Sequence, residues 1–177
     1  MKTVALVVGH GPLRDEGAVS QSGKVTEFDW NTELVRMIQQ LLVGRVNAHV
    51  IFRTVEKISP TSVINSTGAD IALEFHLNDS ETNAATGTEM IHYPGSLRGQ
   101  KLAMVMLEAA VDVLELRNRG IKPPWENRGM GFLKKTNMPA VIVESFFIDN
   151  DNDLLRGTNM KKELAKAYAD AIVQFLQ

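Results

Sequence analysis

The order in which hydrophobic periods follow one another constrains the fold of this chain more than any other feature. Short apolar runs rich in β-branched residues alternate with longer stretches whose apolar residues recur at helical spacing. The short runs are typical of buried strands, and the longer stretches are typical of amphipathic helices. Strands that alternate with helices predict an α/β domain with a mainly parallel sheet.

The residues between these periods allow each element to be placed. Thr26 is expected to cap the first helix, and Pro60 stands in the first turn of the second, where its missing N–H does no harm. Strands are expected at 2–8, 48–52, 70–76, 87–93, 131–134 and 140–146, and helices at 27–42, 60–66, 96–116 and 160–176. The loops are expected at 9–26, 78–86 and 117–128. No linker or repeat interrupts the pattern, which predicts a single domain over residues 1–177.

The composition excludes several classes of function. A net charge of -2 leaves no basic footprint for nucleic acid. The chain has no cysteine, so any metal must be bound by nitrogen and oxygen ligands. No apolar run is long enough to span a membrane, and the amino terminus does not resemble a signal peptide. We therefore expect a monomer that is made in the cytoplasm and neither binds nucleic acid nor inserts into a membrane.

Polar residues able to bind metal stand where three apolar runs end. His10 follows the run at 4–9, His76 follows 71–75, and Glu144 follows 140–143. Because ligands collect beyond the carboxyl ends of strands in an open α/β sheet, these side chains are expected to face one crevice. With Glu27, the set contains two imidazoles and two carboxylates. Such a set can supply three zinc ligands and a base for the attacking water, which predicts a zinc hydrolase.

Each of these residues also has a purely structural explanation. His10 lies between glycines and can be a surface residue of a turn, whereas Glu27 can simply stabilise a helix amino terminus. His76 can be a core histidine bonded to a backbone carbonyl. Glu144 is the most informative of the four, because burying a carboxylate is costly unless it is paired, metal-bound or protonated. Two further histidines are not expected to bind metal: His49 and His92.

Five short segments match one enzyme family in order and spacing. They are GHG at 9–11, TE at 26–27, EFHLN at 74–78, RNRGI at 117–121 and PAVIVESFFIDN at 139–150. Together they resemble the zinc-dependent N-acetylmuramoyl-L-alanine amidases, which include bacterial cell-separation amidases and the catalytic domains of phage endolysins. The resemblance covers essentially the whole chain.

The resemblance implies a fold, a cofactor and a role for each candidate residue. It implies a twisted, mostly parallel six-stranded sheet with helices on both faces. By matching position, His10, Glu27 and His76 would bind Zn²⁺, and Glu144 would be the catalytic carboxylate. The implied substrate is peptidoglycan, cleaved at the amide between the lactyl group of N-acetylmuramic acid and L-alanine. Zinc would acidify the attacking water and polarise the carbonyl, while Glu144 would move the proton.

Two positions depart from the family pattern. An acidic residue usually precedes the first histidine, where this chain has Val7 and Val8. A partner for the ring of His10 must therefore come from elsewhere or be absent. A small residue is common at the position of Phe146, which bears on the shape of the substrate cleft. Neither departure changes the four candidate residues.

Substrate contacts are predicted from side-chain chemistry and position near the expected crevice. The candidates are Asn78, Arg119, Trp125 and Arg128. Two other functions stay open: a zinc peptidase that cleaves within the stem peptide, and a wall-binding module that has lost the chemistry. The origin is open as well. A phage endolysin that waits in the cytoplasm for a membrane pore and the catalytic domain of a longer secreted enzyme would both give this sequence.

Overall fold

The computed structural model describes residues 1–12, 15–53, 60–124 and 130–177 and contains one six-stranded sheet. The strands are β1 (Thr3–Val8), β2 (Asn47–Phe52), β3 (Ile71–Asn78), β4 (Thr88–His92), β5 (Asn118–Lys122) and β6 (Ala140–Phe147). Their order is β2-β1-β3-β6-β4-β5. Strands β2, β1, β3 and β6 are parallel to one another. Strand β4 is antiparallel to β6, and β5 is parallel to β4. The expected mostly parallel six-stranded sheet is confirmed.

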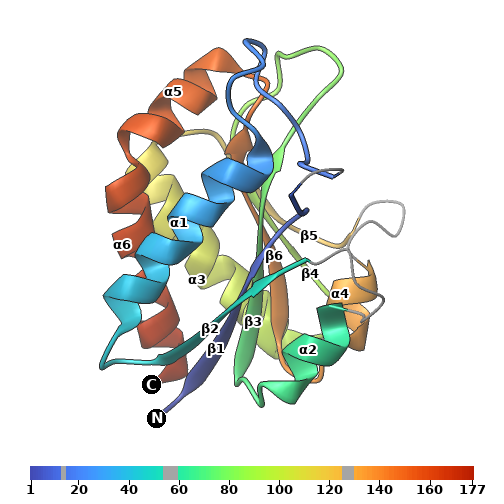
Figure 1. The fold of residues 1–177 in the computed structure, drawn as a ribbon, viewed down its shortest axis with the longest axis vertical. Helices are drawn as coiled ribbons and strands as arrows, with labels where there is room; N and C mark the ends of the chain where they lie inside the picture. Colours follow the sequence, from blue (N-terminus) through green and yellow to red (C-terminus); the bar gives the residue numbers. More distant parts are fainter. Residues whose placement is uncertain (13–14, 54–59, 125–129) are drawn as a thin grey trace.

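Helices cover both faces of this sheet (Figure 1). They are α1 (Glu27–Leu42), α2 (Pro60–Ser66), α3 (Leu97–Leu114), α4 (Met130–Lys135), α5 (Asp151–Asn159) and α6 (Lys161–Leu176). The larger core lies under α1, α3 and α6, and a smaller core lies under α2 and α4. Both faces of the central strands are therefore buried, which explains their continuous apolar runs. In the described part of the chain, no helix is long and apolar enough to cross a membrane.

Two of the expected local assignments were wrong. Residues 131–134, expected to be a strand, belong to helix α4, and residues 118–122, expected to be part of a loop, form strand β5. Phe132 and Leu133 are buried in the smaller core. A run this short does not distinguish a helix from a strand by periodicity. Strand β5 lies at the sheet edge and contains Gly120 at a φ of 85°, so its sequence carries little strand signal.

Helix α5 was not predicted at all. It begins at Asp151, and the side chain of Asn150 caps it by accepting the backbone N–H groups of Asn152 and Asp153. The carboxylate of buried Asp153 accepts the hydroxyl of Thr86 at 2.6 Å and two backbone N–H groups, those of Gly87 and Phe147. These contacts connect the end of β6 to the start of β4. A polar anchor of this kind, rather than an apolar stripe, explains why periodicity missed the helix.

The fold aligns the carboxyl ends of β1, β3 and β6, which are neighbours in the sheet. Val8 pairs with Phe75, and His76 pairs with Glu144, so the polar residues near these ends lie at similar heights. Both β3 and β6 continue past the paired residues, which therefore lie inside the strands rather than beyond them. Helix α1 begins at the same edge (Figure 1).

Candidate functional site

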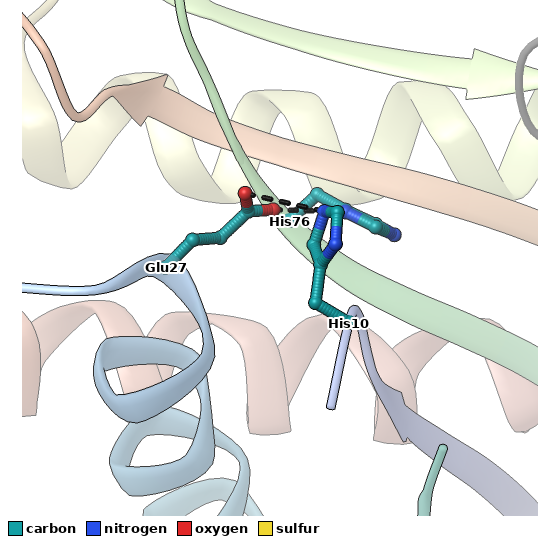
Figure 2. A group of neighbouring side chains, drawn as sticks. All are labelled: His10, Glu27 and His76. Atoms are coloured by element: carbon teal, nitrogen blue, oxygen red, sulfur yellow. Dashed lines mark hydrogen bonds and ion pairs between the residues drawn. The ribbon is translucent and has the colours of Figure 1, made fainter. Parts of the chain in front are cut away.

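His10 reaches this edge through a turn that immediately follows β1. Gly9 donates its N–H to the carbonyl of Phe75 at 2.9 Å, and His10 then adopts a φ of 61°. Positive φ is uncommon for a residue other than glycine and often marks a position constrained by its surroundings. The turn directs the His10 ring toward the side chains of Glu27 and His76 (Figure 2).

Glu27 is the first residue of α1 and is almost completely buried. The hydroxyl of Thr26 caps the helix by accepting the N–H of Asp29 at 3.1 Å, as the sequence predicted. The Glu27 carboxylate accepts two backbone N–H groups, from Ala18 at 2.9 Å and from Leu77 at 3.0 Å. These bonds hold its two oxygens between the loop that follows β1 and the end of β3.

The two histidines converge on this carboxylate, each near a different one of its two oxygens. His76 Nδ1 lies 2.8 Å from Glu27 Oε1, and His10 Nε2 lies 3.3 Å from Glu27 Oε2. One donor atom from each of the three side chains lies within 4.8 Å of the other two, the one such group in the described ranges. Two nitrogens and one carboxylate oxygen suit Zn²⁺ in a catalytic site, where a fourth position stays open. The donor set therefore fits a zinc ion.

Burial and opposite charges set the ionisation of this group in the absence of metal. Burial opposes the charged form of Glu27, but its hydrogen bond to His76 and the charges of both histidines hold its pKa below the usual value. Burial also opposes protonation of His76, yet the neighbouring carboxylates of Glu27 and Glu74 raise its pKa well above the usual value. The site is thus organised to stabilise positive charge between the carboxylates, which is the charge that a metal ion brings.

Glu144 lies beside this group as the register partner of His76. Its Oε2 atom is buried and has no hydrogen-bond partner among the described residues. Burial raises the pKa of Glu144 to about 8, opposed by the charge of His76 and assisted by that of Glu27. Leaving a buried polar atom without a partner is costly, and a catalytic role is one explanation for such an atom in a native protein. A carboxylate with a free oxygen and a raised proton affinity is equipped to act as a base near neutral pH.

Glu144→Gln should stabilise the metal-free protein more at about pH 9 than at about pH 5. The folded pKa of about 8 exceeds the ordinary 4.5, so folding favours the protonated carboxyl. That stabilisation is complete below pH 4.5 and is lost as the pH rises through about 8. Glutamine loses no proton over this range. Thermal midpoints of both proteins at the two pH values measure the effect, and an equal difference at both would contradict the raised pKa.

The predicted substrate-contacting residues have distinct surroundings. Asn78 Nδ2 donates to Glu89 Oε1 at 2.9 Å, and Arg119 Nε donates to Glu89 Oε2 at 2.6 Å. The Arg119 guanidinium also lies over the Phe147 ring, 4.8 Å from its centre. Both side chains are thus joined to one buried carboxylate on β4, the register partner of Glu144 on the other side from His76. The other two predicted residues, Trp125 and Arg128, lie outside the described residues.

Three acidic residues near the site were missed by sequence reasoning. Glu89 links Asn78 to Arg119, as described above, while the two others contact the candidate histidines: Asp15 and Glu74. For Glu74 a signal was present, because an acidic residue interrupts the apolar run at 71–75. Asp15 has no comparable signal in a polar loop.

Comparison with known proteins agrees with the fold and with the family resemblance of the sequence. The family described as N-acetylmuramoyl-L-alanine amidase matches residues 4–174. The chain has a sheet with helices on both faces and a His-Glu-His group at the carboxyl edge of that sheet. These features define its class: an α/β protein with a candidate metal centre. The match to nearly the whole chain then defines the family: this chain belongs to the N-acetylmuramoyl-L-alanine amidases.

Individual relatives extend over most of the chain. It is 29% identical over 174 residues to the N-acetylmuramoyl-L-alanine amidase CwlM of Bacillus licheniformis, covering 94% of this chain and 65% of that protein. It is 28% identical over 187 residues to the endolysin of Bacillus phage SPP1, covering 99% and 66%. The chain thus spans slightly less than two thirds of these relatives. The crystal structure of an N-acetylmuramoyl-L-alanine amidase from Clostridium difficile 630 has the same fold, with a TM-score of 0.85, 23% identity, and coverage of 99% and 96%.

Proposed function

We propose that this chain is a zinc-dependent amidase that hydrolyses peptidoglycan between the lactyl group of N-acetylmuramic acid and L-alanine. The observation that carries the proposal is the convergence of His10, Glu27 and His76 beside Glu144, whose buried oxygen lacks a partner in the described structure. Membership of the amidase family supports the choice of bond. The names of the relatives, an amidase and a phage endolysin, support a role in degrading the cell wall.

In this proposal the three convergent side chains hold Zn²⁺, and Glu144 handles the proton. Bound zinc supplies a Lewis acid that lowers the pKa of water toward about 7 and polarises the amide carbonyl. Glu144 accepts a proton from the attacking water as the new C–O bond forms. It then donates that proton to the L-alanine nitrogen as the C–N bond breaks. Its burial suits both steps, because a raised pKa lets the same carboxyl take up and release a proton near neutral pH.

Substrate contacts are assigned from position. Asn78 and Arg119 are held beside the catalytic carboxylate through Glu89, and we propose that they form the wall of the cleft on the β4 side. To contact the substrate directly, each side chain needs an N–H group that is not already donated to Glu89. The amide of Asn78 and the guanidinium of Arg119 both retain such groups. Trp125 and Arg128 stay predictions from sequence. The expectations of a monomer and of one domain over residues 1–177 also stay predictions.

Digestion of purified peptidoglycan followed by mass spectrometry of the released fragments tests the proposed reaction. The zinc-loaded protein should release stem peptides that begin with a free L-alanine amino group, and it should leave the glycan strands intact. Fragments cleaved within the stem peptide would favour the zinc peptidase instead. If the protein binds zinc and wall fragments but releases no product, the non-catalytic wall-binding module is favoured.

Gly9→Ala should weaken zinc binding while leaving the protein folded. A Cβ atom at position 9 would lie 2.4 Å from His76 Cε1, so the imidazole must shift from its position beside Glu27. Competition with a chromophoric chelator measures zinc affinity, and circular dichroism measures folding. Gly131→Ala is the matched control, because a Cβ atom there meets no atom within 4 Å. Equal zinc affinity in the two variants would contradict the proposed ligand position of His76.

A further inference from the structure

His10 has a second carboxylate neighbour besides Glu27. Its Nδ1 atom lies 2.7 Å from Asp15 Oδ1, while its Nε2 atom faces Glu27. Asp15 is held at this position by the backbone, because its carbonyl accepts the N–H of Gly11 at 2.8 Å. The ring of His10 is therefore contacted by a carboxylate at each of its two nitrogens. Asp15 is therefore the ring partner of His10, in place of the acidic residue that the family pattern has before this histidine.

His76 also has a carboxylate near each ring nitrogen, with the two nitrogens exchanged and a longer outer contact. Its Nδ1 atom faces Glu27, and its Nε2 atom lies 3.7 Å from Glu74 Oε2. Glu74 is only 2% exposed and pairs within the sheet with two buried apolar residues, Val7 and Ile142. A charged residue at such a position is costly unless something compensates it.

Arg53 provides part of that compensation. It follows β2 directly, and its Nη2 atom donates to Glu74 Oε1 at 3.0 Å. Burial disfavours the charged form of Glu74, but His76 and Arg53 together hold the pKa of this carboxyl below its usual value. Replacing a buried ion pair by apolar residues is often neutral or stabilising, so stability alone does not explain this one. Glu74 faces the outer nitrogen of His76, and this contact gives the buried carboxylate a specific role at the site.

We propose that Asp15 and Glu74 are positioning residues, each of which fixes one histidine of the metal site from the side facing away from Glu27. Asp15 accepts the outer ring N–H of His10, and Glu74 faces the outer nitrogen of His76 at ion-pair distance. In each ring the proton is thereby favoured on the outer nitrogen, so that the lone pair of the other nitrogen points toward Glu27. His10 therefore offers Nε2 to a metal, and His76 offers Nδ1. The inference rests on the proposed metal site and adds two residues and a definite choice of nitrogen for each histidine.

A carboxylate that receives the outer N–H of a ligand histidine orients the ring and raises its basicity, and its loss typically weakens metal binding by about 10- to 100-fold. The two residues differ in how they are held. Asp15 lies on an exposed turn, whereas Glu74 is buried and needs the charge of Arg53. Removing the Asp15 carboxylate should therefore affect metal affinity with little change in stability. Removing the Glu74 carboxylate should affect both, because Arg53 loses its partner.

Zinc affinity and the protonation of the ring nitrogens test this inference together. Affinities of the wild type, D15N and E74Q are measured by chelator competition, with D70N as control. Asp70 is also a hydrogen-bonded carboxylate, but it accepts from Lys2 and from the backbone of Thr3 at the opposite edge of the sheet. D15N and E74Q should each bind zinc about 10- to 100-fold more weakly, and D70N should match the wild type. Urea unfolding of the metal-free D15N should match that of the wild type.

Nitrogen-15 NMR of the histidine rings supplies a readout that does not depend on any variant folding. In the zinc-loaded wild type, the proton should reside on Nδ1 of His10 and on Nε2 of His76. A proton on the other nitrogen of either ring would overturn the inference, as would unchanged zinc affinity in D15N and in E74Q. If the wild type takes up no zinc, the metal site itself is refuted and the inference with it. This outcome differs from one in which the wild type binds zinc and both variants bind it equally well, which would refute the inference alone.

Discussion

Glu144→Gln should lower peptidoglycan turnover by about two to four orders of magnitude while one zinc ion per chain is retained. Glutamine preserves the size of the side chain and its position on β6, but it cannot accept the proton of the attacking water. The retained zinc follows from the geometry, because the three convergent donor atoms belong to His10, Glu27 and His76. The loss should therefore fall on kcat rather than on metal content.

Initial rates of peptide release and elemental analysis of the same samples measure the two quantities. Glu108→Gln is the matched control, because it makes the same chemical change on the exposed face of α3. It should leave both turnover and zinc content unchanged. Near-normal turnover in the Glu144 variant would exclude this residue as the base, and loss of zinc would instead place it among the ligands.

His76→Ala should reduce zinc content far below one per chain and abolish hydrolysis. The two remaining protein donors, from His10 and Glu27, do not make the three-ligand set that a catalytic zinc requires. In the wild type, a strong chelator should remove zinc and activity together, and added zinc should restore both. The reversal separates loss of the metal from loss of the fold.

His49→Ala serves as the control for removing an imidazole. His49 is exposed on edge strand β2 and lies outside the convergent group. This variant should keep its zinc and its activity through a cycle of chelation and reloading. Full zinc occupancy in the His76 variant, measured by elemental analysis, would show that the ligand assignment is wrong.

Much of the fold could be predicted from the sequence because its signals are local. The runs that became β1, β3 and β6 are mostly apolar, as is typical of strands covered on both faces. Thr26 marks a helix start because its hydroxyl accepts the N–H of Asp29, and Pro60 marks one because its missing N–H is not needed in a first turn. Both effects involve only near neighbours. Where local signals were weak, as at β5, α4 and α5, the sequence predicted the wrong element or none. Tertiary contacts decide these segments: an edge pairing for β5, burial of Phe132 and Leu133 for α4, and the polar anchor of Asp153 for α5.

The candidate site, too, could be predicted only in part from the sequence. His10, His76 and Glu144 stand out in the sequence because each interrupts or ends an apolar run, and such a residue is costly to bury without a purpose. The distances between these side chains cannot be predicted from the sequence, because they depend on the parallel register of β1, β3 and β6. Only the register pairs His76 with Glu144, and only the turn at His10 directs its ring toward Glu27.

The surroundings of these residues depend on tertiary structure alone. Asn78 and Arg119 have the chemistry of substrate-binding residues, yet both are held by Glu89, more than ten positions away from either. Asp15 and Glu74 carry no sequence feature that connects them with a particular ring nitrogen. A local pattern can show which side chains are costly to bury, since that cost belongs to the residue and its neighbours in the chain. Which partner offsets the cost is decided by strand order and register, which bring distant residues together.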